Sequence, residues 1–551
     1  MVIGVEKLPE IIVRLLEDRG LTDEQSIADY FSPSLSNLSK PEDLPGVAAA
    51  VETILAADGK TVVFGDYDCD GICATAIMVN CLKAIRPKDD ELIVPFLPDR
   101  LKEGYGMSEA SVARMLRENP DVRLVITVDT GINSIGQVAE LKTKGVSVVV
   151  TDHHLPGDEI PAADAVVNPK VAAPDALVGL CGAGVAFLLA NAVVSEAKRR
   201  GLYGGPCIGG PLLVLAGLAT VTDIMPLTGQ NRIIVAEALK RFRQWAPIGL
   251  RELMDRASRS GVAQLTTKDF GFTIGPRINA AGRVASGMEA LELILSDDRE
   301  IARELARIVD THNVERKSIE QRMTDEAVAK IVPDAPSQVI DLPEGHPGVS
   351  GIVAARIMER LDYRVPVCVI AGGHGSARAP DGVNIRDAFE ACKDVLVTYG
   401  GHAAAGGFSV KDGMTDEFRR RLAAYCGALP AVQGADRGAD EPDLWIEPRD
   451  LTVELAEWIS RMEPFGDGNP VPVFGLRAVQ FAEIRPLGNE GRHLQASFRD
   501  RQVPRAVWWN HGDLVEGLRK DSFRRRDILF TVELSDYGER HVELRLTGIG
   551  D

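Results

Sequence analysis

Residues 65–71 read GDYDCDG, so three aspartates, Asp66, Asp68 and Asp70, occupy alternate positions. Carboxylates this close raise one another's pKa unless a cation neutralises them. The spacing begins like the calcium loop of an EF-hand, but the twelfth position of that loop must carry a carboxylate and here it is Ile77. A solvated acidic turn and a site for another divalent metal both remain open at this point.

The flanks of the acidic stretch indicate the element that carries it. Thr61–Phe64 is a β-branched and aromatic run, which predicts a strand, and Ile72–Ile85 is apolar at helical spacing. A strand, an acidic loop and a helix in succession are typical of an open α/β sheet, in which ligands bind beyond the carboxyl ends of the strands.

Polar residues follow other predicted elements in the same way. Leu124–Val128 runs into Asp129, Ser147–Thr151 runs into Asp152-His153-His154, and an apolar helix over residues 210–220 runs into Asp223. Because the carboxyl ends of parallel strands share one edge of a sheet, we expect these side chains to converge there. The converging set is Asp66, Asp68, Asp70, Asp129, Asp152, His153 and His154, with Asp223 nearby.

Carboxylates combined with imidazole suit Mn²⁺ or Mg²⁺. Two such ions about 3.5–4 Å apart, bridged by a carboxylate, activate a water and stabilise an in-line displacement at phosphorus. A lone histidine is usually structural, whereas the pair His153-His154 directly after an aspartate at a strand end favours a functional role.

The elements that must position these residues follow an α/β rhythm. Further strands are expected at Leu92–Phe96 and Ala165–Val167, with helices at Met107–Glu118 and Ser134–Lys144. Such βαβ units predict a mainly parallel sheet. Residues 183–198 are expected to form a largely buried helix.

Composition, prolines and helix-capping residues divide the rest of the chain into segments. A long charged helical stretch occupies residues 286–331, with a cap signal at Ser296-Asp297-Asp298, and ends before Pro333 and Pro336. Short alternating runs such as His493–Phe498 and Ile528–Leu534 predict a small β-barrel or sandwich. The expected segments are an N-terminal helical segment (1–45), a catalytic α/β domain (46–235), a helical connector (236–335), a smaller α/β domain (336–430), a polar acidic linker (431–443) and a C-terminal β domain (444–551).

Bulk properties exclude several classes of protein. A net charge of −18 over 551 residues argues against a general nucleic-acid coat, although a local basic surface remains compatible with a nucleic-acid enzyme. The eight cysteines form no C-x-x-C pair, which argues against structural zinc or a redox dithiol. No apolar run reaches the roughly 18–20 residues of a membrane span, and the start MVIGVEKLPE has no signal-peptide core, so we expect a cytoplasmic protein without a membrane partner.

The motifs also resemble those of a known family. DYDCDG, VDTGIN, TDHH and VTDIMPL resemble, in order, the four motifs of the DHH phosphoesterase superfamily. GPRINAAGR (275–283), HPGVSGIVAARIMER (346–360), GSARAPDGVNIRDAFEAC (375–392) and GGHAAAGGF (400–408) resemble its RecJ family of bacterial exonucleases, and RMEPFGDGNPVPVFG (461–475) resembles the start of that family's oligonucleotide-binding (OB) fold. The resemblance implies a DHH domain with a mainly parallel sheet, a long connecting helix, a smaller DHHA1-type α/β domain and an OB-like β-barrel.

The resemblance further implies a function in DNA repair and recombination. The expected reaction is 5′→3′ hydrolysis of single-stranded DNA to 5′-mononucleotides with two Mn²⁺ or Mg²⁺ ions. A single-strand-binding protein and a helicase are the expected partners, and we expect a monomer. The implied catalytic residues are Asp68, Asp70, Asp129, His153, His154 and Asp223, and the implied metal ligands are Asp66, Asp68, Asp70, Asp129, His153 and Asp223.

Within that set the resemblance implies distinct roles. Asp70 or Asp129 bridges the two metals, and Asp66 completes the second site. His154 faces the scissile phosphate, where it stabilises charge or protonates the leaving oxygen. Asp152 orients the histidine pair from outside the ligand set.

Substrate-binding residues are expected in the remaining motifs, since arginine can donate twice to a phosphate and glycine-flanked amides can cradle one. The phosphate-binding candidates are Arg277, Asn279, Arg283, Ser376, Arg378, Gly401 and His402, against the alternatives of surface ion pairs and a tight turn. Stacking or backbone contacts to DNA are expected from Trp508, Trp509, Arg524 and Arg525 in the C-terminal domain. A solvated barrel face with tryptophans in the core remains the alternative there.

Two departures from the family pattern stand out. Some relatives carry a histidine ligand where this chain has Phe64, which puts the second metal in question, and Ala379 replaces a small hydroxyl residue after the arginine. Two other functions stay open. A phosphodiesterase for short oligonucleotides usually lacks the long C-terminal extension, and an inactive DNA-binding scaffold tends to lose metal ligands that are present here.

Overall fold

The computed structural model describes residues 8–104, 106–206, 208–257, 265–430, 441–535 and 540–550, without the side chain of Asn489. The chain divides into two compact units. The larger unit contains residues 39–225 and 229–435, and the smaller contains residues 1–38, 226–228 and 436–551. Residues 431–440, most of the predicted linker, lie outside the described part.

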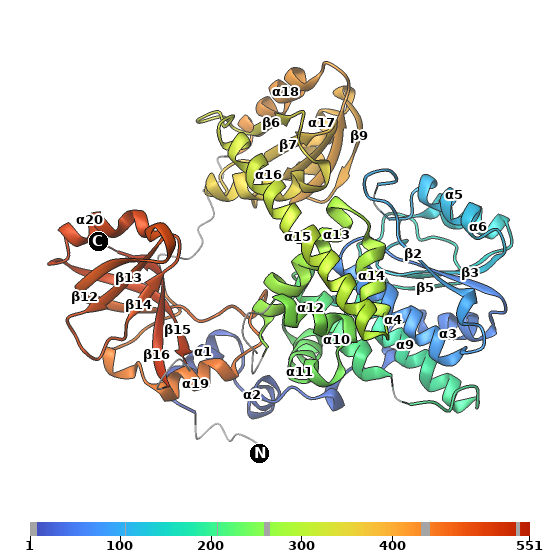
Figure 1. Ribbon diagram of the computed structural model, residues 1–551, viewed down its shortest axis with the longest axis horizontal. Coiled ribbons are helices and arrows are strands. Elements are labelled where there is room, and N and C mark those ends of the chain that lie inside the picture. The colour runs from blue at the N-terminus through green and yellow to red at the C-terminus, as the bar shows by residue number, and fades with distance from the viewer. Residues whose placement is uncertain are drawn as a thin grey trace. The chain divides into compact units, whose positions relative to one another are not determined.

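The larger unit begins with a parallel sheet of five strands in the order β2-β1-β3-β4-β5. β-branched residues dominate these strands because both faces of the sheet are covered by helices (Figure 1). The predicted strands are confirmed with slightly shifted ends. Their bounds are β1 Lys60–Phe64, β2 Ile93–Phe96, β3 Val122–Thr127, β4 Ser147–Thr151 and β5 Ala165–Val167.

The central helix of this domain is α4, Cys69–Ile85, which packs against α9, Gly182–Arg199, and α10, Gly209–Thr222. Its N-terminus is capped by Asp68, whose Oδ1 accepts a hydrogen bond from the Gly71 amide at 3.0 Å. The other helices of the domain are α3 Val47–Ala56, α5 Glu109–Glu118, α6 Ile135–Thr143, α7 Pro169–Ala172 and α8 Asp175–Val178.

A helical region follows, and its longest helix leads into the second sheet. That helix is α15, Arg299–Val328, and Asp298 caps it by accepting hydrogen bonds from the amides of Glu300 and Ile301. The predicted cap signal is thereby confirmed. The remaining elements are α11 Gly229–Trp245, α12 Ile248–Ala257, the π-helix Asp269–Ile274, α13 Gly275–Val284 and α14 Gly287–Leu295.

The second sheet has the order β6-β7-β8-β10-β9, with β6 parallel to β7 and the other pairs antiparallel. Two buried apolar clusters hold this domain together, one of which includes Phe389, Phe408 and Phe418. The strands are β6 Gln338–Leu342, β7 Val367–Ala371, β8 His374–Arg378, β9 Leu396–Gly401 and β10 Ala405–Val410, and the helices are α16 Ser350–Arg360, α17 Ile385–Ala391 and α18 Thr415–Gly427.

The smaller unit is built on a barrel that closes where β12 pairs with β15. Its hydrophobic core also includes Ile12, Leu16 and Ile27 from the N-terminal helices, so residues 1–38 belong to this unit. The expected domain boundaries otherwise stay predictions. The strands are β11 Leu444–Trp445, β12 Phe474–Leu487, β13 His493–Phe498, β14 Ala506–Trp508, β15 Arg525–Ser535 and β16 His541–Ile549, and the helices are α1 Glu10–Asp18, α2 Glu24–Phe31, α19 Val453–Arg461 and α20 Val515–Lys520.

Among the helices of the described residues, none combines the length and apolar character needed to cross a lipid bilayer.

Candidate active site

The acidic loop is buried at the carboxyl end of β1. Asp66 and Asp70 are both almost fully inaccessible to solvent. The Asp70 carboxylate accepts hydrogen bonds from the amides of Gly182 and Ala183, each at 2.7 Å, at the start of α9. A helix N-terminus favours negative charge, so α9 both orients Asp70 and stabilises its ionised form.

Asp129 follows β3 and enters the same edge of the sheet in a left-handed backbone conformation, with φ at 59°. A Cβ placed on Gly182 would lie 2.5 Å from the Asp129 Cβ, which real Cβ atoms essentially never do. Only glycine at this point of α9 therefore leaves room for the Asp129 side chain in its observed position.

His153 lies at the centre of the carboxylates. Its Nε2 is 3.1 Å from Asp129 Oδ1, 3.6 Å from Asp70 Oδ2 and 3.7 Å from Asp223 Oδ2. Asp66 and Asp68 join Asp129 in a second group. The residue sets whose ligand atoms lie within 4.8 Å of one another are Asp129, His153 and His154; Asp70, His153 and Asp223; and Asp66, Asp68 and Asp129. The structure thus brings together every residue expected to ligate metal.

The electrostatics of this cluster are unfavourable without a cation. Burial, followed by the charge of Asp68, raises the pKa of Asp66 well above its ordinary value, and burial with the charge of Asp70 does the same to the pKa of Asp129. Burial also raises the pKa of Asp70, and burial with the Asp70 charge raises the pKa of Asp223 to about 8. Divalent cations resolve this conflict.

The buried Asp66 Oδ1 has no hydrogen-bond partner among the described residues, and the buried Asp129 Oδ1 accepts no hydrogen bond there although His153 Nε2 lies 3.1 Å away. A buried acceptor without a donor is costly, and a cation would satisfy both. The donor set of carboxylate oxygens with one imidazole fits Mn²⁺ or Mg²⁺. Phe64 is fully buried with its ring centroid 5.0 Å from that of Phe96, so it belongs to the core and supplies no ligand.

Asp152 organises the histidine pair. Its Oδ1 accepts hydrogen bonds from the His153 amide at 2.7 Å and the His154 amide at 3.1 Å, and lies 2.7 Å from His154 Nδ1. Burial alone would raise the pKa of Asp152, but the hydrogen bonds and charge of His154, with the Ile132 amide, outweigh it and lower the pKa. Burial alone would lower the pKa of His154, but Asp152 raises it. This geometry fits the orienting role expected of Asp152.

Two of the expected phosphate-binding arginines are largely buried. Arg283 donates from Nη1 to the Gly348 carbonyl at 3.2 Å, and Arg378 donates from Nη1 to the carbonyl of its neighbour Ala377 at 2.8 Å. Burial and the charge of Arg100 lower the pKa of both, that of Arg283 to about 10. The Ser376 hydroxyl lies 2.8 Å from that of Ser350 on α16.

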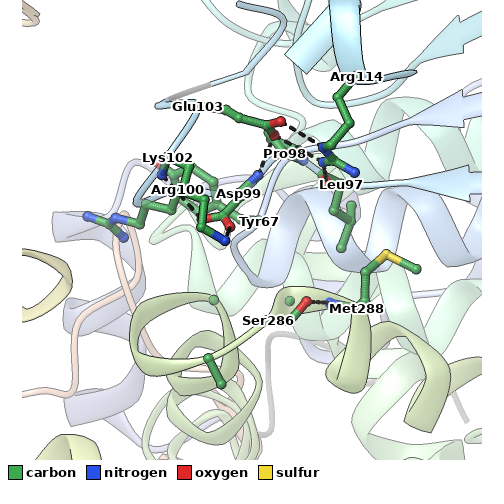
Figure 2. Close-up of a pocket in the computed structure, with 13 residues that line it drawn as sticks. Tyr67, Leu97, Pro98, Asp99, Arg100, Lys102, Glu103, Arg114, Ser286 and Met288 are labelled. Atoms are coloured by element: carbon green, nitrogen blue, oxygen red, sulfur yellow. Dashed lines mark hydrogen bonds and ion pairs between the residues drawn. The ribbon is translucent and has the colours of Figure 1, made fainter. Parts of the chain in front are cut away.

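Arg100 was missed by the sequence analysis. Its guanidinium carbon lies 4.9 Å from the centre of the Tyr67 ring, and both residues line a cavity of about 240 Å³ with Ser286 and Met288 on the opposite side (Figure 2). Among the described residues, none of Arg100, Arg283 and Arg378 forms an ion pair with a carboxylate. An arginine just beyond the carboxyl end of β2 is the signal that would have found it.

Arg277 and Asn279 have other partners. Arg277 Nε donates to Asp310 on α15 at 2.9 Å, and its Nη1 donates to the Thr273 carbonyl at 2.7 Å. The Cys69 amide donates to Asn279 Oδ1 at 2.7 Å, so Asn279 holds the acidic loop. Phosphate binding by these two residues stays a prediction that these contacts do not support.

Gly401 and His402 lie where β9 turns back into β10. The His402 amide donates to the Ala405 carbonyl at 2.8 Å, so the chain makes the tight turn that was the alternative to phosphate binding, here between two strands and not between a strand and a helix. The exposed His402 ring is stacked on the His154 ring with centroids 6.5 Å apart and planes 8° apart. Burial, followed by His154, lowers the pKa of His402. Ala379, buried beside this turn, offers no hydroxyl.

The candidate DNA-binding residues of the barrel lie largely at its surface. Trp509 is 49% exposed and its ring meets that of His493 edge-on, with centroids 4.6 Å apart. Trp508 is partly buried against the core and stacks on His511 at 4.1 Å. Arg545, which the sequence analysis missed, lies 5.3 Å from the Trp509 ring. Arg524 and Arg525 are exposed near Phe523, another exposed aromatic residue.

Comparison with known proteins identifies families that match two parts of the chain. The DHH family, N-terminal domain, matches residues 60–204, and the RecJ OB domain matches residues 442–547. Relatives named single-stranded-DNA-specific exonuclease RecJ include one from Thermus thermophilus, 38% identical over 89% of this chain and 70% of its own length. Another, from Dickeya dadantii, is 32% identical over 98% of this chain and 96% of its own length. One from Bacillus subtilis is 31% identical over 96% of this chain but only 66% of its own length.

Solved structures of RecJ also match this chain. RecJ from Thermus thermophilus in complex with Mn²⁺ matches with a TM-score of 0.81 at 31% identity, covering 99% of this chain and 78% of that one. The same protein in complex with Mg²⁺ matches with a TM-score of 0.75 at 29% identity, covering 99% and 77%. The identity and coverage of these relatives show that the chain belongs to the RecJ family of DHH proteins.

Proposed function

We propose that this protein is a metal-dependent exonuclease that hydrolyses single-stranded DNA from the 5′ end to 5′-mononucleotides, in DNA repair and recombination. The observation that carries the proposal is the contact of His153 with three carboxylates, beside the buried Asp66 Oδ1, which has no hydrogen-bond partner among the described residues. Its relatives are named single-stranded-DNA-specific exonucleases.

Two Mn²⁺ or Mg²⁺ ions would be held by the clustered residues. We assign Asp70, His153 and Asp223 to one ion and Asp66 and Asp68 to the other. Asp129 shares one group with Asp66 and Asp68 and another with His153, so it would be the better candidate than Asp70 for a ligand shared by both ions. When bound, such ions supply an activated water and neutralise charge developing at phosphorus.

The protein groups around the metals complete the chemistry. Asp152 raises the pKa of His154 and so favours the charged form, which would stabilise the scissile phosphate or protonate the leaving oxygen. Asp152 fixes the ring because it accepts from both the His154 amide and the imidazole. The exposed His402 ring, stacked on that of His154, would be a further group beside the phosphate.

Cleavage from the 5′ end would follow from phosphate binding by three neighbouring arginines, the arginine cluster Arg100, Arg283 and Arg378. The charge of Arg100 acts on both Arg283 and Arg378, and none of the three forms an ion pair with a carboxylate among the described residues, so a terminal phosphate is the anion that suits them. A 5′-phosphate anchored there would hold the end of the strand near the metal centre, which would account for release of mononucleotides. Ser376 adds a hydroxyl beside Arg378.

Exposed aromatic and basic residues on the barrel would bind the rest of the strand. Trp509, with the His493 ring edge-on to it and Arg545 near its face, offers an exposed ring of the kind that accepts bases without reading sequence. We further propose that the protein acts in the cytoplasm as a monomer, with a single-strand-binding protein and a helicase delivering substrate.

The test uses a single strand of about 40 nucleotides, labelled at the 5′ or the 3′ end, incubated with the purified chain and Mn²⁺. We expect the 5′ label to appear at once as mononucleotide, the matching duplex to survive, and Asp129→Ala to be inactive. Replacing the 5′-phosphate by a hydroxyl should slow the wild type but not Arg378→Ala, which has already lost that contact. Cleavage confined to di- to tetranucleotides would overturn the proposal in favour of a short-oligonucleotide phosphodiesterase, and binding without cleavage would favour a scaffold.

A further inference from the structure

Lys170 follows an outer strand of the parallel sheet, at the same edge as the metal centre. β4 runs into residues 152–154, which contain the histidine pair, and its parallel neighbour β5, which ends at Val167, runs into residues 168–170. Because the carboxyl ends of parallel strands share one edge of a sheet, these two loops are neighbours. The second loop leads to Lys170, a cation that the sequence analysis did not single out.

Asn168 joins the two loops. Its side chain is fully buried, its Nδ2 donates to the His154 carbonyl at 2.9 Å, and its Oδ1 accepts from the Lys170 amide at 2.8 Å. One side chain therefore ties the backbone of the histidine pair to the backbone of Lys170. All three residues lie in the larger unit, so this arrangement is set within that unit.

The Lys170 side chain is partly exposed, and its ammonium forms no hydrogen bond or ion pair with any residue that the structure describes. Its charge nevertheless reaches the metal centre. Burial is the largest cause of the pKa shifts of His153, Asp223 and His402, and the charge of Lys170 also acts on all three, in each case lowering the pKa. A cation beside a metal site repels the metal ions, so metal binding does not explain its place here.

The arginine cluster and Lys170 act on different parts of the metal centre. The charge of Arg100 acts on Asp66, which belongs to one group of candidate ligands, whereas the charge of Lys170 acts on His153 and Asp223, which belong to another. A strand whose 5′-phosphate is held by the arginine cluster and whose first internucleotide phosphate lies at the metals would therefore continue towards Lys170.

We propose that Lys170 binds the second internucleotide phosphate of the strand, which is next to the scissile phosphate on its 3′ side. An ammonium suits this position because it is a compact charge with three donors that binds phosphate without a fixed orientation. The phosphate would be the anionic partner that Lys170 lacks among the described residues. The inference rests on the proposed function, since it adds a substrate contact to that same site.

The test measures the first cleavage of single strands that carry a labelled 5′-phosphate, with the purified full-length chain and Mn²⁺. One strand has an uncharged methylphosphonate at the second internucleotide linkage, and the reference strand is unmodified. We expect the methylphosphonate to slow release of the first mononucleotide by the wild type about tenfold, as the loss of one contact to a charged group would do. Lys170→Ala should cleave the unmodified strand more slowly by a similar factor, and the methylphosphonate should slow this variant no further.

The matched control is Lys88→Ala, which removes the same charge from an exposed lysine of the same domain. Lys88 lies between the end of α4 and the start of β2, so it is at the amino edge of the sheet, away from the metal centre. Lys88→Ala should behave as the wild type does on both strands. Lys170→Arg keeps the charge and should remain sensitive to the methylphosphonate. Circular dichroism shows whether each variant is folded, and Lys170→Gln replaces Lys170→Ala if the latter is not.

The outcomes separate this inference from its premise. If the methylphosphonate slows the wild type and Lys170→Ala equally, or slows neither, the Lys170 contact is overturned and the proposed function stands. If the wild type releases no mononucleotide from the unmodified strand, the proposed function is overturned and the inference with it. Sensitivity that is present in the wild type and in Lys88→Ala but lost in Lys170→Ala supports both.

Discussion

The metal centre and the aromatic face of the barrel are built in opposite ways. Asp129 is 2% exposed, its backbone is in a disfavoured conformation, and α9 approaches it so closely that only glycine fits. Trp509 is 49% exposed, and its neighbours are the edge of a histidine ring and the long side chain of an arginine. A buried, over-determined site suits chemistry that needs fixed geometry, and an open surface suits a ligand whose sequence varies.

The largest effect should come from removing Asp129, the proposed ligand shared by both metal ions. Asp129→Ala deletes a carboxylate that belongs to groups on both sides of the centre, so we expect activity to fall about a thousandfold or more while DNA binding persists. Steady-state nuclease assays and fluorescence anisotropy with labelled single strands measure the two properties. Equal loss of both would mean that catalysis and DNA binding are not separated between the two regions.

Adding one methyl group beside Asp129 should displace this ligand without changing the ligand itself. Gly182→Ala places a Cβ 2.5 Å from the Asp129 Cβ, so we expect activity to fall by about 10- to 100-fold. Gly136→Ala is the matched control, since Gly136 also lies in the first turn of a helix and its Cβ would meet nothing within 4 Å. An unchanged rate in Gly182→Ala would show that the site is less rigid than its packing indicates.

The barrel surface should respond more mildly. Trp509→Ala removes a stacking platform, which is worth about 1–3 kcal/mol per base. We expect KM for a strand of about 40 nucleotides to rise by about tenfold with kcat unchanged, and hydrolysis of tetranucleotides to be unaffected. A fall in kcat on tetranucleotides would assign Trp509 to the catalytic steps and remove the contrast between the regions.

The smallest expected effect is the release of a proton from Asp223 when Mn²⁺ binds. Because burial and Asp70 raise the pKa of Asp223 to about 8, this carboxyl is mostly protonated at about pH 7 in the metal-free protein, and Mn²⁺ must displace the proton. We expect proton release on Mn²⁺ binding at about pH 7 and less release at about pH 9, where Asp223 is already ionised. Calorimetric titrations in buffers of different ionisation enthalpy measure this, and Asp223→Asn should reduce the release at the lower pH.

The metal centre was predictable because its residues follow from local patterns. Asp66–Asp70, Asp129 and Asp152–His154 each follow a β-rich run, and strands that are parallel deliver their carboxyl ends to one edge. Arg277 was not predictable in this way. Its partner Asp310 lies on α15, and which acidic residue of a long helix passes an arginine depends on how the helices cross.

The sequence by itself determined the strands, the capped helices and the acidic edge, because these depend on periodicity and on residues that are close along the chain. Only the tertiary structure decided the arginine cluster, the core that α1 and α2 share with the barrel, and the contact between Leu227 and residues 466–468. The pairs that show this come from distant segments, namely Arg100 with Arg378, Tyr30 with Asn469, and Leu227 with Asp467. Their meeting is set by packing of whole elements, which no local pattern records.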